Sequence, residues 1–399
     1  MDRRNFLKAS LSGIPVLSST NLKSGWIDNL TENDSQSDSP RKRIRDLGVK
    51  IGTMETGLHN AITDVEGVRV GQTTLISGEG KGAVRTGVTV ILPNNGNIYK
   101  ENLFAAFFNQ NGWGEMTGVV SIENTGKLKT PIFLTGTYNV GIVYNAALKY
   151  LLKKHPKMGA TEEIVPPVVA ECFDSFLSDV RSRTIAEKDV VQAIEKASGG
   201  PVEEGAVGGG TGMRSFGFKA GIGTSSRKVR DNFLVGVLVM ANTARRDQLR
   251  IDGAPVGKEI KGFELKRQNT KSIILIAATN APFLPFQLIK IAKRAAMGLA
   301  QTGAISSSGS GDIILAFSTA NKISKNKKDS FQNIKAISDS RITPFYQATV
   351  EATHEAIINA LTSAQTIVGR NNNTAYGIPL DQVEKIMKKY GRIKENNHE

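Results

Sequence analysis

The segment KRQNTKSIILIAATNAP, residues 266–282, changes character in its middle. Residues 266–271 are polar and charged, whereas Ser272 opens an apolar run, Ile273 to Ala278, that is typical of a buried β-strand. A hydroxyl group at the first position of such a strand has two interpretations. Serine often ends a turn, or the chain is cut before Ser272 and this residue becomes a catalytic N-terminus. The rest of the sequence has to decide between them.

Further apolar runs predict the other strands of the fold. They are rich in Val, Ile and Leu, are bounded by Gly, Pro or Asn, and cover 87–93, 131–136, 166–173, 232–242 and 312–319. Apolar residues at helical spacing predict amphipathic helices at 140–155, 286–303, 343–361 and 380–391. Strands and helices do not alternate in a regular βαβ rhythm, so the pattern favours a layered α+β fold in which helices cover sheets.

Two of the helices have a face that we expect to be buried. In 140–155 the residues near one stripe are Ile142, Ala146, Leu148, Leu151 and Leu152. In 286–303 they are Leu288, Ile291, Ala292, Ala295 and Leu299, with lysine and arginine on the opposite side.

Composition excludes some classes of protein. The 399 residues are 40% hydrophobic and 22% charged, which fits a globular protein. The net charge of +14 could indicate a nucleic-acid partner. The charge is scattered along the sequence and no aromatic-basic motif accompanies it, so we expect that the protein does not bind nucleic acid. One cysteine excludes an internal disulfide, the four histidines lack metal-ligand spacing, and no apolar segment is long enough to span a bilayer.

The N-terminus, MDRRNFLKASLSGIPVLSS, pairs Arg3 and Arg4 ahead of a short apolar stretch. This pattern resembles a twin-arginine export signal, with a basic tail as the alternative interpretation. Residues 20–41 are rich in Ser, Asn and Asp and indicate a linker. We therefore predict an exported, periplasmic protein in which 1–41 is signal and linker and 42–399 is a single domain.

A glycine-rich segment and a polar residue at a strand end are candidates for the functional site. EGAVGGGTGMRSFGFKAG, residues 204–221, lacks the Gly-Lys-Ser/Thr ending of a phosphate loop, so a turn that brings backbone close to a substrate is favoured. Asn242 ends the apolar strand 232–242, where it is either a simple cap or an amide donor to an oxyanion.

Carboxylates accompany two other strands. Ser310 and Asp312 are two residues apart at the start of 312–319, so they project from the same face, although Ser-Gly-Asp is also ordinary turn chemistry. Glu171 follows three apolar residues and needs a cationic partner if it is buried. That partner is either an internal Lys or Arg or the ammonium group of a substrate.

Together with Ser272, three blocks in this order carry a specific resemblance: GGGTGM (208–213), RIDGAPVG (250–257) and GSGDIILAFSTAN (309–321). The chain resembles the self-processing serine aminopeptidases, the family of the L-aminopeptidase/D-amidase–D-esterase and the β-peptidyl aminopeptidases. The resemblance extends from residues 59–75 to 343–361, most of the chain outside the N-terminal segment.

The resemblance implies a four-layered α-β-β-α sandwich like that of N-terminal-nucleophile hydrolases. It implies self-cleavage between Lys271 and Ser272 into 42–271 and 272–399, after which Ser272 is the nucleophile. The family's supporting serine and acid match Ser310 and Asp312, its oxyanion asparagine matches Asn242, and its carboxylate for the substrate's amino group matches Glu171. It further implies a small peptide or amide substrate with a free amino group, no cofactor, and a homo-oligomer of cleaved αβ units.

Three positions depart from the family pattern. Lys271 stands where Gly or Asn precedes the cut, Asp312 stands where the β-peptidyl enzymes have Glu, and Phe173 stands where a Tyr is frequent, which removes a hydroxyl from the substrate site. Two alternatives stay open. One is an acyltransferase like ornithine acetyltransferase, which uses Thr at the cut; Thr270 is near, but the strand begins at Ser272. The other is a non-catalytic binding protein that kept the fold.

Overall fold

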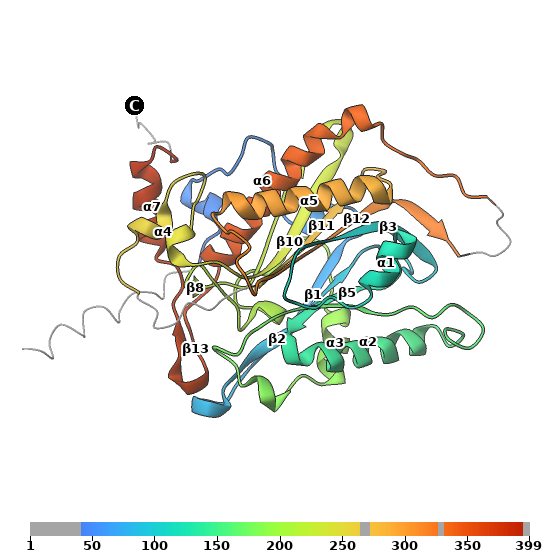
Figure 1. The fold of residues 1–399 in the computed structure, drawn as a ribbon, viewed down its shortest axis with the longest axis horizontal. Coiled ribbons are helices and arrows are strands. Elements are labelled where there is room, and N and C mark those ends of the chain that lie inside the picture. Colours follow the sequence, from blue (N-terminus) through green and yellow to red (C-terminus); the bar gives the residue numbers. More distant parts are fainter. Residues whose placement is uncertain (1–40, 264–271, 326–330, 394–399) are drawn as a thin grey trace, which may run out of the picture. The chain divides into compact units, whose positions relative to one another are not determined.

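The computed structural model describes residues 41–263, 272–325 and 331–393, in which two β-sheets lie face to face between helices (Figure 1). The four-stranded sheet has the order β1-β2-β5-β6, with β1 (Arg69–Ser77), β2 (Val84–Leu92), β5 (Ile132–Gly136) and β6 (Val168–Cys172). The six-stranded sheet has the order β4-β3-β12-β11-β10-β9, with β3 (Glu101–Gly112), β4 (Lys127–Leu128), β9 (Ile222–Lys228), β10 (Leu234–Asn242), β11 (Ser272–Thr279) and β12 (Gly311–Ser324).

Seven α-helices are present in the described ranges, with two short hairpins. The helices are α1 (Val119–Thr125), α2 (Val140–Lys154), α3 (Glu187–Glu195), α4 (Val256–Glu259), α5 (Pro285–Gln301), α6 (Thr343–Thr362) and α7 (Leu380–Lys389). The hairpins are β7 (Arg214–Ser215) with β8 (Phe218–Lys219), and β13 (Ile367–Val368) with β14 (Thr374–Ala375). No helix of the described part is long and apolar enough to cross a membrane.

The apolar run after Ser272 forms the centre of the larger sheet because both of its faces are buried. Ile274 and Ile276 belong to the core between the two sheets, whereas Ile273 and Leu275 belong to the core beneath α5 and α6. This alternation follows from the two-residue period of a strand. A strand covered on both faces needs a continuous apolar sequence, which is what residues 273–278 supply.

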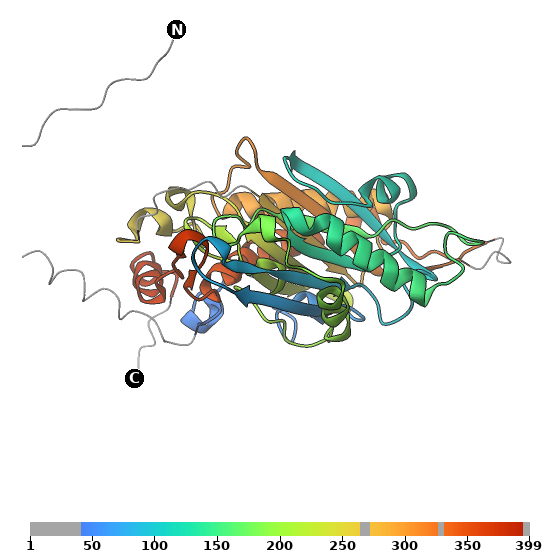
Figure 2. The ribbon, with the colours of Figure 1, turned by 90° about the horizontal axis from the view of Figure 1, so that it is seen from below.

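Helices close the outer face of each sheet. α5 and α6 pack on the six-stranded sheet, and α2 and α3 pack on the four-stranded sheet (Figures 1 and 2). Gly223 of β9 lets α6 approach closely, since a Cβ atom at this position would lie 2.0 Å from the carbonyl oxygen of Ala356. The four layers are α-β-β-α, so the predicted fold class is confirmed.

The predicted helices are present, but the prediction of which residues of α2 are buried is wrong in part. The stripe predicted for α5 is buried as expected. On α2 the buried residues are Val143, Ala146, Ala147 and Leu151, whereas Leu152 is 41% exposed. The small side chains of Ala146 and Ala147 set the contact face of this helix, which is rotated from the stripe that we predicted.

Candidate active site

Ser272 lies where three strands of the larger sheet come together at their ends. It is the first residue of β11 and pairs with Asn242, the last residue of the antiparallel β10. On its other side Ser272 pairs with Gly311, the first residue of the parallel β12. This register places the residues predicted from three separate segments at one edge of the sheet. Ser272 itself is 4% exposed.

The Asn242 side chain is held by two hydrogen bonds that fix its orientation. Its Oδ1 accepts from the backbone N–H of Arg214 at 3.0 Å, and its Nδ2 donates to the carbonyl oxygen of Phe173 at 3.0 Å. The contact with Arg214 requires an acceptor, so the oxygen and nitrogen of the amide cannot be exchanged. Nδ2 carries two N–H groups, and Phe173 accepts only one hydrogen bond from it.

Ser310 and Asp312 form the hydrogen-bonded pair that their spacing predicted. Ser310 Oγ donates to Asp312 Oδ1 at 2.6 Å, and both residues are buried. Burial raises the pKa of Asp312, while the hydroxyl groups of Ser306 and Ser310 oppose that rise. The pair flanks Gly311, the β12 partner of Ser272, so a buried hydroxyl and a buried carboxylate lie one residue to either side of that position.

Glu171 is buried and has no Lys or Arg in an ion pair with it among the residues that the structure describes. Its Oε1 accepts from the backbone N–H of Glu115 at 3.1 Å, and its Oε2 accepts from the hydroxyl of Thr137. Burial raises the pKa of Glu171, while these two hydrogen bonds oppose the rise. The internal cationic partner is therefore not found in the described ranges.

Ser272, Asn242 and Glu171 share one pocket of about 900 Å³. Its lining residues are Gly112, Trp113, Gly114, Glu115, Thr137, Glu171, Phe173, Asn242, Ser272, Ser308 and Gly309. Phe173 is 48% exposed and makes an edge-to-face contact with Tyr138 at 6.3 Å between ring centroids. An aromatic wall therefore stands beside the polar groups of the pocket.

Sequence reasoning missed Thr137, Glu115 and Trp113. One signal for Thr137 was available, since it directly follows β5, and β5 runs parallel to β6. The carboxyl ends of parallel neighbours meet at one edge, so Thr137 and Glu171 were candidates for the same site. Glu115 and Trp113 carried no comparable signal, because they lie in the irregular segment after the end of β3 at Gly112.

The glycine-rich segment does not approach a substrate as we predicted. Gly208, Gly209 and Gly210 are buried, and none of them lines the pocket. The N–H groups of Gly208 and Gly209 donate to the hydroxyls of Thr74 and Thr89. A Cβ atom at Gly209 would lie 2.6 Å from the carbonyl oxygen of Leu134, so glycine is required for packing between strands. The prediction failed because the sequence does not show whether the N–H groups of a glycine segment bond to a substrate or to side chains of the protein.

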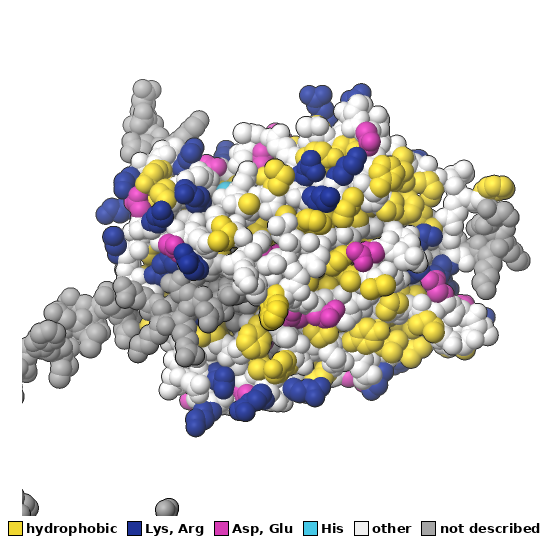
Figure 3. All heavy atoms as spheres, viewed as in Figure 1, with side chains coloured by type: hydrophobic (Ala, Val, Ile, Leu, Met, Phe, Trp, Pro, Cys, Tyr) yellow, Lys and Arg dark blue, Asp and Glu magenta, His cyan; other side chains and the backbone are white. Residues whose placement is uncertain are grey.

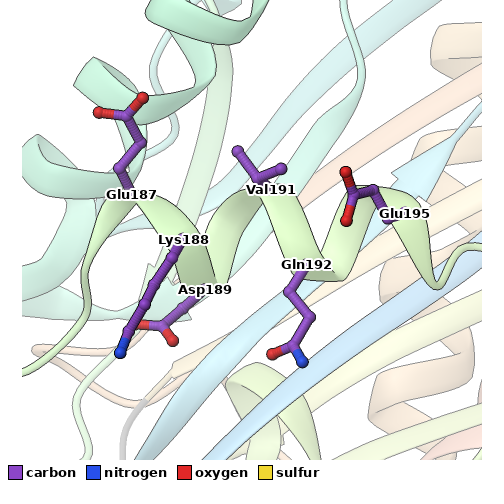
Figure 4. A pocket seen from close by; sticks show the side chains of 6 residues that line it. All are labelled: Glu187, Lys188, Asp189, Val191, Gln192 and Glu195. Carbon is purple, nitrogen blue, oxygen red and sulfur yellow. The ribbon is translucent and has the colours of Figure 1, made fainter.

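A second concavity, of about 730 Å³, lies on α3 (Figure 4). Glu187, Lys188, Asp189, Val191, Gln192 and Glu195 line it. It contains no Ser, Thr or Cys side chain, and all of its lining residues come from one helix, whereas residues of several strands meet in the pocket at Ser272. On the face in Figure 3, Lys and Arg side chains are spread mostly along the margins. Within the described ranges no cluster of three His, Cys, Asp or Glu side chains could hold a metal ion.

Two parts of the sequence-based predictions fall outside the described residues. Lys271, the residue before the predicted cut, is one of them, and so are residues 1–40 with the paired arginines. Asn242, Ser272, Ser310, Asp312, Glu171 and Phe173 are all described and lie at or beside the pocket.

Fold and site together define a class of protein, a serine-type peptidase with an N-terminal-nucleophile hydrolase fold. The family model for peptidase family S58 matches residues 60–375, and the chain belongs to this family. It is 41% identical over 375 residues to the beta-peptidyl aminopeptidase BapA of Sphingosinicella microcystinivorans, covering 88% of this chain and 93% of that protein.

Solved structures agree with this assignment. The PH0078 protein of Pyrococcus horikoshii superposes with a TM-score of 0.83 at 46% identity, over 88% of this chain and 100% of that one. The L-aminopeptidase D-Ala-esterase/amidase of Ochrobactrum anthropi, described as a prototype of the serine aminopeptidases and a variant of the Ntn hydrolase fold, superposes with a TM-score of 0.82 at 36% identity, over 88% and 99%. The predicted family, fold and aminopeptidase function are thereby confirmed.

Proposed function

We propose that the chain cleaves itself before Ser272 and that the new N-terminal serine then removes the N-terminal residue from small peptides and amides, β-aminoacyl substrates among them. The β-aminoacyl class is supported by the 41% identity to a beta-peptidyl aminopeptidase. The serine mechanism is supported by the convergence of Ser272, Asn242 and Glu171 on one pocket.

Self-cleavage in this proposal is an acyl shift within the chain. Ser272 Oγ attacks the carbonyl carbon of Lys271, the peptide C–N bond breaks, and the nitrogen becomes the free amino group of Ser272. The resulting ester is hydrolysed by water, which leaves a carboxylate on Lys271. No external cofactor takes part in these steps.

Substrate cleavage repeats this chemistry on another amide. A free α-amino group with a pKa of about 8 accepts the proton of its own hydroxyl, so no histidine is required. Ser272 Oγ attacks the substrate carbonyl, and the Asn242 Nδ2 group donates to the oxygen that becomes negative. The leaving amine takes the proton, and water then hydrolyses the ester. One such donor contributes ~3 kcal/mol of transition-state stabilisation.

Glu171 carries the inference that only N-terminal residues are removed. Its carboxylate is buried, lines the same pocket as Ser272, and has no cationic partner within the described residues. A buried carboxylate is stabilised by a cation. We assign that role to the substrate's ammonium group, held by Glu171 while the hydroxyl of Thr137 and the N–H of Glu115 fix the carboxylate.

The test compares an aminoacyl p-nitroanilide with its N-acetyl form, on the parent enzyme and on the Glu171→Gln variant. We expect the parent to hydrolyse only the free amine, and Glu171→Gln to lose ~100-fold in kcat/KM, about 2.7 kcal/mol, while still cleaving itself. Glu123→Gln, in α1 and outside the pocket, is the matched control. Equal hydrolysis of the N-acetyl substrate would refute amine recognition by Glu171.

Two alternatives are distinguished by adding an acceptor amine to the assay and by measuring the chain's size on a denaturing gel. An acyltransferase would pass the acyl group to an added amine faster than to water, and a non-catalytic binding protein would stay a single chain. Export by the twin-arginine route and assembly into a homo-oligomer of αβ units stay predictions from the sequence.

A further inference from the structure

Lys219, in the hairpin β7–β8, is fully buried yet has no carboxylate in an ion pair with it among the described residues. Its Nζ donates to three backbone carbonyl oxygens instead. They belong to Met213 at 2.8 Å, Gly210 at 3.2 Å and Ala220. A buried lysine with only carbonyl partners is uncommon, since an ammonium group is costly to bury without pairing. This free-energy cost suggests that the Lys219 ammonium group has a role that an apolar side chain could not perform.

The peptide unit between Met213 and Arg214 connects Lys219 to the candidate active site. Its carbonyl oxygen accepts from Lys219 Nζ, and its N–H, that of Arg214, donates to Asn242 Oδ1 at 3.0 Å. The hydrogen bonds therefore run in one direction, from the Lys219 ammonium through one peptide plane to the Asn242 amide. Asn242 in turn pairs with Ser272 across β10 and β11.

We propose that Lys219 is a positioning residue, which orients and polarises the Asn242 amide through the Met213–Arg214 peptide. This inference rests on the proposed function, in which Asn242 stabilises the oxyanion. Hydrogen bonds in a chain strengthen one another, and those that begin at an ionised donor are the strongest. A cation at the far end draws electron density away from the Asn242 nitrogen, so its N–H groups become better donors to a negative oxygen.

The three carbonyl acceptors match the three N–H donors of an ammonium group. A neutral amine has only two, and its lone pair would then face a carbonyl oxygen. Burial and the nearby Arg214 lower the pKa of Lys219 well below its usual value. The hydrogen bonds to three carbonyl oxygens favour the charged form and oppose that change. We infer that these three acceptors keep Lys219 charged, although no carboxylate of the described residues forms an ion pair with it.

The first test replaces Lys219 by methionine, which has nearly the same length and no N–H group. On the p-nitroanilide substrate we expect kcat to fall by ~10-fold or more, with KM changed by less than about twofold, because only the transition state gains from a stronger oxyanion donor. Lys129→Met is the matched control, since Lys129 is also buried but pairs with Glu163 and is not among the residues that line the pocket. A parent-like kcat in Lys219→Met would overturn the proposal.

A double-mutant cycle separates positioning from general destabilisation. In an Asn242→Ala background the hydrogen-bond chain has lost its end, so Lys219→Met should change kcat by less than about twofold. If Lys219→Met has the same effect with and without Asn242, Lys219 acts on the fold and the proposal is wrong. If Ser272→Ala stays active, the proposed function fails instead, whatever Lys219 does.

A measurement on the parent protein decides the question even if Lys219→Met does not fold. In a sample labelled with ¹⁵N-lysine, the Lys219 Nζ signal should be that of an ammonium with slowly exchanging protons at neutral pH. Addition of 1-aminoethylboronic acid, which forms a tetrahedral adduct with a serine hydroxyl, should shift this signal. A neutral amine, or an ammonium signal that the adduct leaves unmoved, would contradict the proposal.

Discussion

Asp312 is buried, accepts a hydrogen bond from Ser310, and places a carboxylate one residue from Gly311, the β12 partner of Ser272. Asp312→Asn keeps the size and one acceptor oxygen but removes the charge. We expect kcat to fall by ~100-fold, on the scale of a lost preorganised electrostatic contact. The measurement is steady-state hydrolysis of the p-nitroanilide, with the exposed Asp247→Asn as the control. Parent-like activity in Asp312→Asn would show that the charge of Asp312 does not support catalysis by Ser272.

At the residue scale, sequence predicted the groups whose spacing is local. Ser310 and Asp312 are two positions apart on one strand, so a period of two suffices to bring them together. The contacts that hold Glu171 are different in kind, because Thr137 and Glu115 lie 34 and 56 residues away. Only the parallel pairing of β5 with β6 and the turn after β3 bring them to the carboxylate.

At the scale of elements, β9 and α6 are joined by buried charges. Arg227 of β9 is fully buried and pairs with Glu355 at 2.7 Å and with Glu351 at 3.2 Å, both on α6. Arg45 also pairs with Glu355 at 2.7 Å. Every charge in this cluster has a partner, so the cluster fixes the position of α6 across the sheet.

Replacing Arg227 breaks two of the three ion pairs of that cluster and leaves Arg45 as the cationic partner of Glu355. We expect Arg227→Met to lower the free energy of unfolding by ~2–3 kcal/mol, less than for a wholly unpaired buried charge, because Glu355 loses its fully buried partner but keeps Arg45. The control Arg245→Met breaks an exposed pair with Asp247 and should change stability by less than ~1 kcal/mol. Urea unfolding of both variants in the Ser272→Ala background measures the difference. A cost for Arg227→Met no larger than that of its control would show that the cluster does not stabilise α6.

Apolar runs predicted β2, β5, β6, β10, β11 and β12, whereas β1, β3 and β9 were not predicted. For β9 the physical reason is clear. Its sequence from Ile222 to Lys228 contains Thr224, Ser225, Ser226 and Arg227, all buried. Hydrophobicity marks a strand as buried only when apolar side chains fill it. Here the buried polar side chains bond to residues distant in sequence, such as Asn60 and Glu355. A local sequence pattern cannot predict these partners.

At the scale of the whole molecule, buried carboxylates link stability to pH. Burial raises the pKa of Asp174 from 3.8 to about 6, against the effect of the Thr86 hydroxyl. The folded state then holds a proton that the unfolded state has lost between these two values. This group's contribution to stability is therefore fully present below pH 3.8 and is lost as the pH rises to about 6.

Asp174→Asn should remove that dependence. Relative to its Ser272→Ala parent, we expect the variant to gain on the order of 3 kcal/mol between pH 3 and pH 8. Denaturant unfolding at both pH values measures the difference, which cancels the contributions of the other carboxylates. A difference between variant and parent that does not change with pH would contradict the raised pKa.

The central claim is that the polar segment before β11 is cut and that Ser272 becomes the nucleophile. The strand pairing supports it by placing Ser272 beside Asn242 and Gly311 at the edge that forms the pocket. The measurement that tests it most directly is intact mass with N-terminal sequencing of the purified chain. We expect two pieces, the smaller of about 14 kDa from the 43.0 kDa chain and beginning Ser-Ile-Ile-Leu, and a single inactive chain for Ser272→Ala. A smaller piece with any other N-terminus, or an active enzyme that stays intact, would contradict the account.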